Sequence, residues 1–354
     1  MYKLNKKISE LEPYSPITGD YKIRLDANES CFNLPENIIE QIKQAVTSID
    51  YNRYPDPYAI ELCTAFANYY GISPENVTAF NGSDELITLL MTTFMMSGET
   101  LVTVEPDFSM YRFYTSLAEL NCVSAPKNDD LSVDIDVVIN TVKENGARGV
   151  IFSNPCNPTS KGINKEDVIK LITSVDALVI LDEAYMDFWD ASILSLVNDY
   201  DNLIIMRTAS KAVGAAAIRL GFAVTNKINS NALKAVKSPY NVNTVSQKIG
   251  AIIYNNKDFL QKRRNTIVTL RENLYNELKT IEKKYSDKIK IVSGCSNFVF
   301  IKSDKSKDIF NFFLDNGAAI RLMNSYLRIT AGTEEENRYV IMLLKKFLGR
   351  EEIL

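Results

Sequence analysis

Histidine is absent from this chain of 354 residues. The absence excludes every mechanism that depends on an imidazole, including Ser-His-Asp triads, Cys-His pairs and metal sites with histidine ligands. Cysteine is scarce as well: the five residues are an odd number, lie far apart and form no C-x-x-C pair. This spacing predicts no disulfide framework and no metal site, and it favours a reducing compartment such as the cytoplasm. Any chemistry must therefore come from carboxylates, lysine, arginine, tyrosine, serine or a bound cofactor.

Long apolar runs are also missing. No segment approaches the ~20 apolar residues that a membrane-spanning helix needs, and no apolar stretch of a secretory signal follows the lysine-rich start. The charges nearly balance, with 40 Lys and Arg against 44 Asp and Glu and a net charge of −4. A mildly acidic chain lacks the positive field that attracts nucleic acid, so we expect neither a nucleic-acid nor a membrane partner.

The composition is otherwise that of a globular protein, and the length predicts about two domains. All 11 prolines lie between Pro13 and Pro239, so the last 115 residues (354 − 239) contain none. This change places a domain boundary soon after Pro239. We expect an N-terminal arm over residues 1–29, a large domain over 30–245 and a small domain over 246–354.

The middle of the chain alternates between short apolar runs and helical patterns. Apolar runs of this kind are typical of strands that are buried on both faces. The expected strands are Val77–Phe80, Thr100–Val104, Cys122–Ala125, Gly149–Ser153, Ala177–Asp182, Leu203–Arg207 and Gly221–Thr225. Their alternation with helices predicts an α/β fold, in which a mostly parallel sheet carries helices on both faces.

Beyond Asn241 the pattern changes to long helices and a few strands. One long helix is expected to run from there to Leu278. The later elements are expected at Ile289–Ser293, Phe298–Lys302, Ser306–Asn316, near Ala319–Arg321, at Tyr326–Thr330 and in a last helix from Thr333. This order predicts a smaller α+β domain.

Polar residues gather where the expected strands end, which is where open α/β sheets bind ligands. Asn81-Gly82-Ser83 forms a tight turn into a helix, with Ser83 as the expected N-cap. The free N–H groups of a helix start suit a phosphate. An ordinary capped helix has the same sequence pattern, so the turn alone does not establish a site.

A lysine follows another strand end, in Thr208-Ala209-Ser210-Lys211. Its amine can form a Schiff base with a carbonyl substrate or with pyridoxal phosphate. Ser210 and Arg219 are suited to holding a phosphate nearby. A surface lysine beside a structural arginine remains the alternative for this segment taken alone.

Asp182 ends an apolar strand, where a carboxylate needs a partner. Pyridoxal phosphate enzymes place a carboxylate on the pyridine nitrogen. A helix N-cap is the other interpretation, and only the combination with Lys211 favours the cofactor. Tyr185 and Asn157 are candidates for contact with the phenolic oxygen. Asn157 lies in a loop stiffened by two prolines, where a cis bond is allowed.

Together these segments resemble the fold type I pyridoxal phosphate-dependent aminotransferases, and within them the histidinol-phosphate aminotransferase group. The resemblance covers nearly the whole chain. Its segments are Leu11-Glu12-Pro13-Tyr14, Leu25-Asp26-Ala27-Asn28-Glu29, Arg53-Tyr54-Pro55-Asp56, Asn81-Gly82-Ser83-Asp84-Glu85, Pro106-Asp107-Phe108, Asn154-Pro155-Cys156-Asn157-Pro158-Thr159, Asp182-Glu183-Ala184-Tyr185, Thr208-Ala209-Ser210-Lys211, Arg219-Leu220-Gly221-Phe222 and Leu327-Arg328-Ile329-Thr330.

The resemblance implies a role for each matched residue. Lys211 would bind pyridoxal 5'-phosphate and move the substrate proton, Asp182 would pair with the pyridine nitrogen, and Tyr185 would contact the phenolic oxygen. The other cofactor contacts would come from Asn157, Phe108 on the ring face, and Gly82, Ser83, Asp84, Ser210 and Arg219 on the phosphate. Tyr54 would reach the phosphate of a partner subunit, which implies a homodimer with a shared site. The substrate would be held by Tyr14, Asn28, Arg321 and Arg328.

The implied reaction moves the amino group of histidinol phosphate to 2-oxoglutarate, giving imidazole acetol phosphate and glutamate in histidine biosynthesis. Arg321 and Arg328 are only seven residues apart (328 − 321), fewer than the family usually has. The shorter loop leaves open an aminotransferase for other amino acids, aromatic ones included, or a threonine-phosphate decarboxylase.

Two non-enzymatic or unrelated alternatives are disfavoured. A pyridoxal phosphate-sensing regulatory domain would need a DNA-binding region, and no basic helix-turn-helix precedes Asp26. A Rossmann nucleotide binder would need G-x-G-x-x-G, which is missing. The aromatic stripe of Tyr111, Phe113 and Tyr114 is expected to be core or dimer contact.

Overall fold

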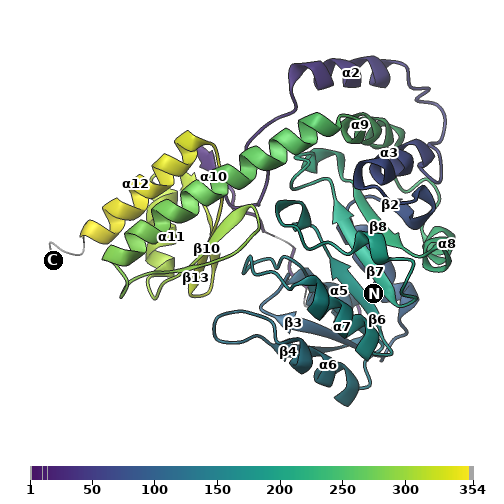
Figure 1. The fold of residues 1–354 in the computed structure, drawn as a ribbon, viewed down its shortest axis with the longest axis horizontal. Coiled ribbons are helices and arrows are strands. Elements are labelled where there is room, and N and C mark those ends of the chain that lie inside the picture. The colour runs from purple at the N-terminus through teal and green to yellow at the C-terminus, as the bar shows by residue number, and fades with distance from the viewer. Residues whose placement is uncertain (1, 10, 14, 351–354) are drawn as a thin grey trace.

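A seven-stranded sheet is the centre of the larger part of the molecule (Figure 1). The computed structural model describes residues 2–9, 11–13 and 15–350. The strands are β2 (Val77–Phe80), β3 (Thr100–Glu105), β4 (Asn121–Pro126), β5 (Gly149–Ser153), β6 (Leu178–Asp182), β7 (Leu203–Thr208) and β8 (Gly221–Thr225). Their order is β2-β8-β7-β6-β5-β3-β4. Strand β8 runs antiparallel to the other six, which all run in one direction. The predicted strands and the mostly parallel sheet are thus confirmed.

Helices cover both faces of this sheet, because side chains alternate across each strand. One face packs Val150 and Phe152 against α3 (Ile60–Tyr70), α6 (Ile135–Glu144), α7 (Lys165–Ser174) and α9 (Thr244–Asn255). The other packs Ile151 against α4 (Ser83–Leu89), the π-helical turn η2 (Leu90–Phe94), α5 (Met110–Leu117) and α8 (Lys227–Val236). With both faces covered, the ligand-binding region is left at the ends of the strands.

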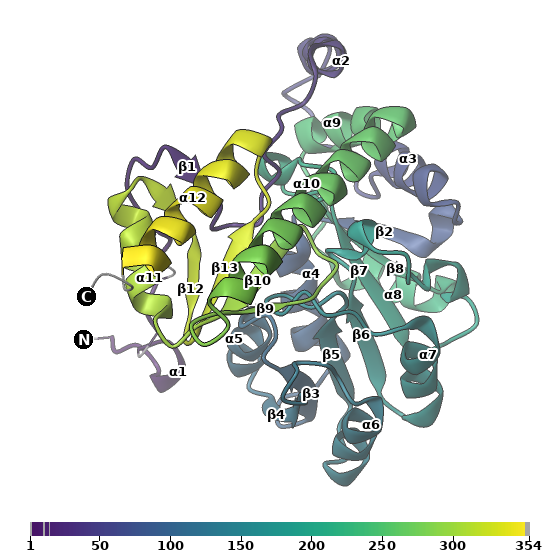
Figure 2. The same cartoon turned by 60° about the vertical axis from the view of Figure 1, so that its left-hand side comes forward.

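A second sheet lies in the C-terminal part (Figure 2). It is antiparallel in the order β12 (Arg321–Met323), β13 (Tyr326–Thr330), β10 (Phe298–Lys302), β9 (Lys290–Val292). Its apolar core is shared with α10 (Lys257–Lys284), α11 (Ser306–Asp315) and α12 (Glu334–Arg350). Among the described residues, no helix combines the length and apolar character that crossing a bilayer requires.

The N-terminal segment joins this second core. Strand β1 (Ile23–Arg24) pairs in parallel with β11 (Ala318–Ala319), and Ile23 and Leu25 are buried there. Helix α1 (Lys6–Ser9) precedes this strand, and α2 (Glu36–Thr47) follows it and contacts α9. The segment around β1 is therefore part of the second core.

Two predicted elements are divided in the structure. The single long helix expected after Asn241 is wrong: α9 ends at Asn255 and α10 begins at Lys257, because Asn256 has non-helical dihedrals. Its side-chain amide donates to the carbonyl of Ile252 at 2.8 Å, a local bond by which asparagine competes with the helix backbone. The strand expected near Ala319–Arg321 is divided between β11 and β12, which belong to different sheets.

Candidate active site

Four predicted site segments meet at one edge of the large sheet. Strands β5, β6 and β7 are parallel, and β2 runs in the same direction because both β2 and β7 are antiparallel to β8. Their carboxyl ends lead into Asn157, Asp182, Lys211 and Ser83. The topology brings these residues to one place although they span more than a third of the chain.

Lys211 is half-buried in the turn that follows β7. Its Nζ donates a hydrogen bond to the carbonyl oxygen of Ala27 at 3.1 Å. The same nitrogen lies 5.9 Å from the centre of the Tyr185 ring. The amine thus sits between the end of β6 and the N-terminal segment, with no carboxylate recorded as its ion-pair partner among the described residues.

Asp182 is buried at the end of β6. Its Oδ2 accepts a hydrogen bond from the hydroxyl of Tyr111 at 2.7 Å, and its Oδ1 accepts one from the amide of Ala184 at 3.0 Å. Burial raises the pKa of Asp182 to about 6, and the two hydrogen bonds act in the opposite direction. A carboxylate in this setting gains from a cationic ligand such as a protonated pyridine.

Tyr185 is buried and connects the site to both sheets. Its hydroxyl accepts a hydrogen bond from Nδ2 of Asn28 at 2.8 Å. Its ring meets Phe298 of β10 edge-on, with ring centres 5.4 Å apart. Asn28 has a left-handed backbone (φ 54°), and its backbone N–H donates to Oγ1 of Thr330 at 3.1 Å. Asn28 therefore stands next to the phenol of Tyr185, at the junction of the two sheets.

Arg328 enters the site from β13. Its guanidinium donates to Oδ1 of Asn157 at 2.6 Å and to the carbonyl of Asp26 at 2.8 Å. Asn157 lies in a loop whose Asn154–Pro155 and Asn157–Pro158 bonds are cis, as the sequence allowed. The residue predicted to hold the substrate thus touches the residue predicted to contact the cofactor.

The turn between β2 and α4 offers an anion cradle, defined here by Gly82, Ser83, Ser210 and Arg219. Gly82 has φ 83° and is the N-cap, so the prediction that Ser83 caps the helix is wrong; Ser83 is its first residue. A Cβ on Gly82 would lie 2.8 Å from a nitrogen of Arg219, which places that guanidinium against the turn. Ser210 is buried beside Thr208, whose hydroxyl donates to it at 3.0 Å.

Two further residues complete this edge. Asp84 forms an ion pair with Arg219 at 3.5 Å, with both side chains about half exposed. Phe108 is partly buried before α5 and meets Tyr111 edge-on, with ring centres 5.5 Å apart. Gly221 faces the turn so closely that an added Cβ would lie 2.5 Å from the carbonyl carbon of Gly82, so only glycine fits there.

One predicted residue lies away from the other site residues. Tyr54 is 81% exposed, and its ring stacks on Tyr240 at 4.6 Å rather than on any site residue. Arg321 is half-buried directly opposite Arg328 in the β12–β13 pair. Tyr14 lies outside the described residues.

Two features of the site were missed in the sequence. Tyr111 was expected to be core or dimer contact, and it is buried in the core, but its hydroxyl also reaches Asp182. Beneath the strand ends, Arg207 forms buried ion pairs with Glu183 at 2.7 Å and with Asp187 at 2.9 Å. A charged residue inside an apolar strand was the available signal for this network, whereas nothing local identified the partner of Tyr111.

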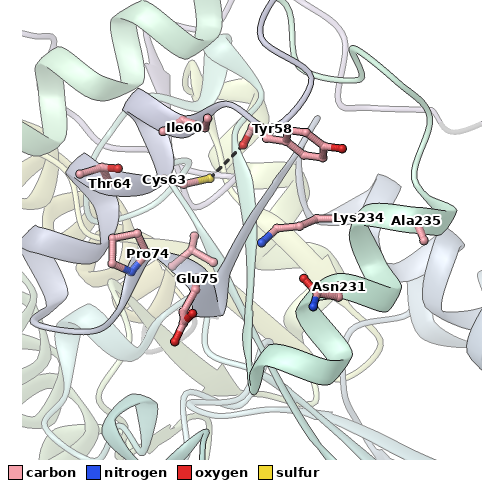
Figure 3. Close-up of a pocket in the computed structure, with 10 residues that line it drawn as sticks. Tyr58, Ile60, Cys63, Thr64, Pro74, Glu75, Asn231, Lys234 and Ala235 are labelled. Carbon is pink, nitrogen blue, oxygen red and sulfur yellow. Dashed lines mark hydrogen bonds between the residues drawn. The ribbon is translucent and has the colours of Figure 1, made fainter.

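A pocket of about 560 Å³ lies away from this edge (Figure 3). Asn231 and Lys234 of α8 line it together with Cys63 of α3 and Pro74. It also touches Val77, which begins β2, whereas the predicted site lies where that strand ends. None of the predicted site residues that the structure describes lines this pocket.

Comparisons with known proteins agree with the expected resemblance. The family model for aminotransferase class I and II matches residues 20–344. A protein of Clostridium novyi (strain NT) named histidinol-phosphate aminotransferase is 40% identical over 345 residues, covering 96% of each chain. The crystal structure of histidinol-phosphate aminotransferase from Sinorhizobium meliloti in complex with pyridoxal-5'-phosphate aligns with a TM-score of 0.86 at 22% identity, covering 98% of this chain and 97% of that one. L-threonine-O-3-phosphate decarboxylase from Porphyromonas gingivalis aligns with a TM-score of 0.78 at 18% identity, covering 92% and 99%.

Proposed function

Since the chain belongs to the class I and II aminotransferase family, we propose that it is a pyridoxal phosphate-dependent histidinol-phosphate aminotransferase. It transfers the amino group of histidinol phosphate to 2-oxoglutarate, giving imidazole acetol phosphate and glutamate, a step of histidine biosynthesis. The 40% identity over nearly the full length of a relative with that name supports the substrate.

One observation carries the catalytic part of the proposal. The amine of Lys211 lies over the ring of Tyr185. Tyr185 follows the buried carboxylate of Asp182 by three residues. A carbonyl-binding amine and a buried anion at adjacent strand ends are the pair that a cofactor with an aldehyde and a basic ring nitrogen requires. The anion cradle supplies the third requirement, a place for its phosphate.

Each residue then has a defined task toward the cofactor. Bound pyridoxal phosphate supplies an electron sink for the electrons left when the substrate loses its Cα proton. Lys211 holds the cofactor and moves that proton, and Asp182 binds the pyridine nitrogen. Tyr185, with Asn28 on its hydroxyl, and Asn157 are placed for the phenolic oxygen, and Phe108 for the ring face. Arg328 binds the anionic end of the substrate as a planar bidentate cation, with Arg321 and Tyr14 as its proposed partners.

The β12–β13 hairpin supports a second candidate. Arg321 and Arg328 are direct cross-strand partners, joined by a short turn in which Asn324 has φ 53°. A short hairpin changes the space that receives the distal group of the substrate. A smaller phosphorylated substrate, as in threonine-phosphate decarboxylase, would fit such a space.

A substrate panel separates these candidates. We expect the highest kcat/KM with histidinol phosphate, with one glutamate formed from 2-oxoglutarate per amine consumed. Threonine phosphate and the aromatic amino acids should react much more slowly. The measurement is glutamate formation together with CO2 release. Release of CO2 from threonine phosphate without any demand for an oxo acid would establish the decarboxylase instead.

We further propose a homodimer in which Tyr54 binds the cofactor phosphate of the partner subunit. The exposed Tyr54 is held away from its own site by its stack on Tyr240. The neighbouring Tyr58 and Ile60 are also exposed, which supports contact of this segment with a second copy.

Exchange of subunits tests the shared site. Tyr54→Phe removes one hydrogen bond to a charged group, so the Kd for pyridoxal phosphate should rise roughly 10- to 150-fold. An equimolar mixture of Tyr54→Phe and Lys211→Ala subunits, assayed at limiting cofactor, should regain about a quarter of wild-type activity, because half of the dimers then hold one intact site. Tyr51→Phe is the matched control, because within the described part of the chain that hydroxyl bonds only to the carbonyl of Val46. No recovery in the mixture would place Tyr54 in its own subunit's site or outside the site.

The compartment and the domain boundaries are proposals as well. All five cysteines are free, which supports a reducing cytoplasm. Separate apolar cores on the two sheets support a large and a small domain, proposed over 30–245 and 246–354, with α9 at their boundary packed in the core of the large one. The arm over 1–29 includes β1, which packs with the second core.

A further inference from the structure

The Asp182 carboxylate has an unusual set of neighbours. It is buried, and among the described residues it takes part in no ion pair with a lysine or arginine. Apart from Tyr111, the titratable groups that act on it are the carboxyls of Asp107, before α5, and Asp84, on α4. Both disfavour its ionised form. Its recorded donors are one backbone amide and the hydroxyl of Tyr111.

Tyr111 is fixed where it stands. Its side chain is 1% exposed, on the buried face of α5. Phe108 meets its ring edge-on, so the residue predicted to cover the cofactor ring also packs against the phenol. Burial, then the neighbouring Asp182 and Asp107, raise the pKa of Tyr111 well above its usual value, and Cys156 acts in the same direction. The hydroxyl therefore remains a proton donor near neutral pH.

We propose that Tyr111 is a positioning residue that keeps Asp182 ionised and turns its remaining lone pairs toward the pyridine nitrogen of the cofactor. The inference rests on the proposed function for the identity of that nitrogen, but the Tyr111–Asp182 contact belongs to the protein alone. The chain has no histidine, and the phenol of Tyr111 supports the carboxylate in its place. Unlike an imidazole, the phenol does not titrate near neutral pH.

The test is a titration of Asp182 in the cofactor-free protein. Carbon-13 NMR of protein labelled at the aspartate carboxyl group follows its midpoint, and Asp182→Asn assigns the signal. Tyr111→Phe keeps the ring and removes the hydroxyl, so the midpoint should move upward by about 1 to 2 pH units. Tyr254→Phe is the matched control, because that buried hydroxyl has no hydrogen-bond partner among the residues the structure describes, and it should leave the midpoint unchanged. An unchanged midpoint in Tyr111→Phe would overturn the proposal.

Unfolding provides a second readout that needs no label. An Asp whose folded-state pKa is raised stabilises the protein below its unfolded pKa of ~3.9, and this contribution is lost as the pH rises through the folded value of about 6. In Tyr111→Phe the loss should extend 1 to 2 pH units higher, measured as the difference between the two proteins in urea at each pH. Coincident pH profiles would contradict the proposed role.

The two proposals fail in different ways. Tyr111→Phe should also move the acidic limb of the kcat profile to higher pH in the loaded enzyme. A protein that binds no pyridoxal phosphate but shows the shifted Asp182 midpoint would end the proposed function and keep the Tyr111–Asp182 coupling. An active transaminase in which Tyr111→Phe leaves the Asp182 midpoint unmoved would keep the proposed function and end the Tyr111–Asp182 coupling.

Discussion

Lys211→Ala is expected to lower kcat for transamination by at least about 10²- to 10⁴-fold, the usual contribution of a positioned proton-transfer group. The loss should be larger than that of any other single substitution in the site, because the same amine also binds the cofactor. Its present contact, the carbonyl of Ala27 at 3.1 Å, is a single backbone bond that the amine can leave when a ligand enters. Steady-state kinetics with the amino donor and 2-oxoglutarate measure the effect.

Covalent attachment gives an independent measure of the same residue. After incubation with pyridoxal phosphate and reduction with borohydride, the wild-type peptide that contains Lys211 should carry the added mass, and the variant should carry none. Lys227→Ala is a suitable control, because that lysine, the first residue of α8, is exposed and forms an ion pair with Glu75. Full turnover in Lys211→Ala would show that another residue carries the chemistry.

Glu183→Gln is expected to give the largest loss of stability, about 3 to 5 kcal/mol of the free energy of unfolding. The substitution leaves the buried guanidinium of Arg207 short of one of its two carboxylates. Burial acts to lower the pKa of Arg207, but Glu183 and Asp187 outweigh it, and the pKa is raised. The arginine therefore stays charged when Glu183 is neutralised, and the desolvation cost of that charge is no longer offset.

A surface pair gives the matched control for this loss. Lys248 and Glu61 are 2.6 Å apart, but their side chains are 42% and 61% exposed, against 3% and 0% for Arg207 and Glu183. Glu61→Gln should cost no more than about 1 kcal/mol, since water and salt screen the pair. Urea unfolding of the three cofactor-free proteins measures the difference. Equal losses for both variants would show that the buried pair contributes no more to the free energy of unfolding than the surface pair.

The large sheet was predictable from local sequence because its strands are buried on both faces. Gly149–Ser153 and Gly221–Thr225 have the predicted bounds, and the other strands of that sheet begin and end within one residue of prediction. The strand ends then placed Asp182 and Lys211 together, because parallel strands share a carboxyl edge. Residues that follow such strands could be singled out from local sequence, whereas the roles proposed for them rest on the resemblance of the whole chain to a known family.

Contacts between distant segments were not predictable in this way. Strand β1 is two residues long, and its partner β11 is a piece of a segment expected to be one strand. The bond from Asn28 to Thr330 joins residues 302 positions apart, and the bond from Tyr111 to Asp182 joins residues 71 apart. The periodicity of a sequence does not indicate such pairs. The hydrogen bonds of the proposed site and the break at Asn256 could therefore not be predicted without the structure.

The pairing of β1 with β11 also affects the order in which parts of the protein can fold during synthesis. Ile23 leaves the ribosome 295 residues (318 − 23) before the strand that it pairs with. At roughly 5–20 residues per second, the segment next to Ala27 and Asn28 waits about 15 to 60 seconds for its place in the second core. All seven strands of the large sheet are therefore synthesised before this segment can be fixed beside the proposed site.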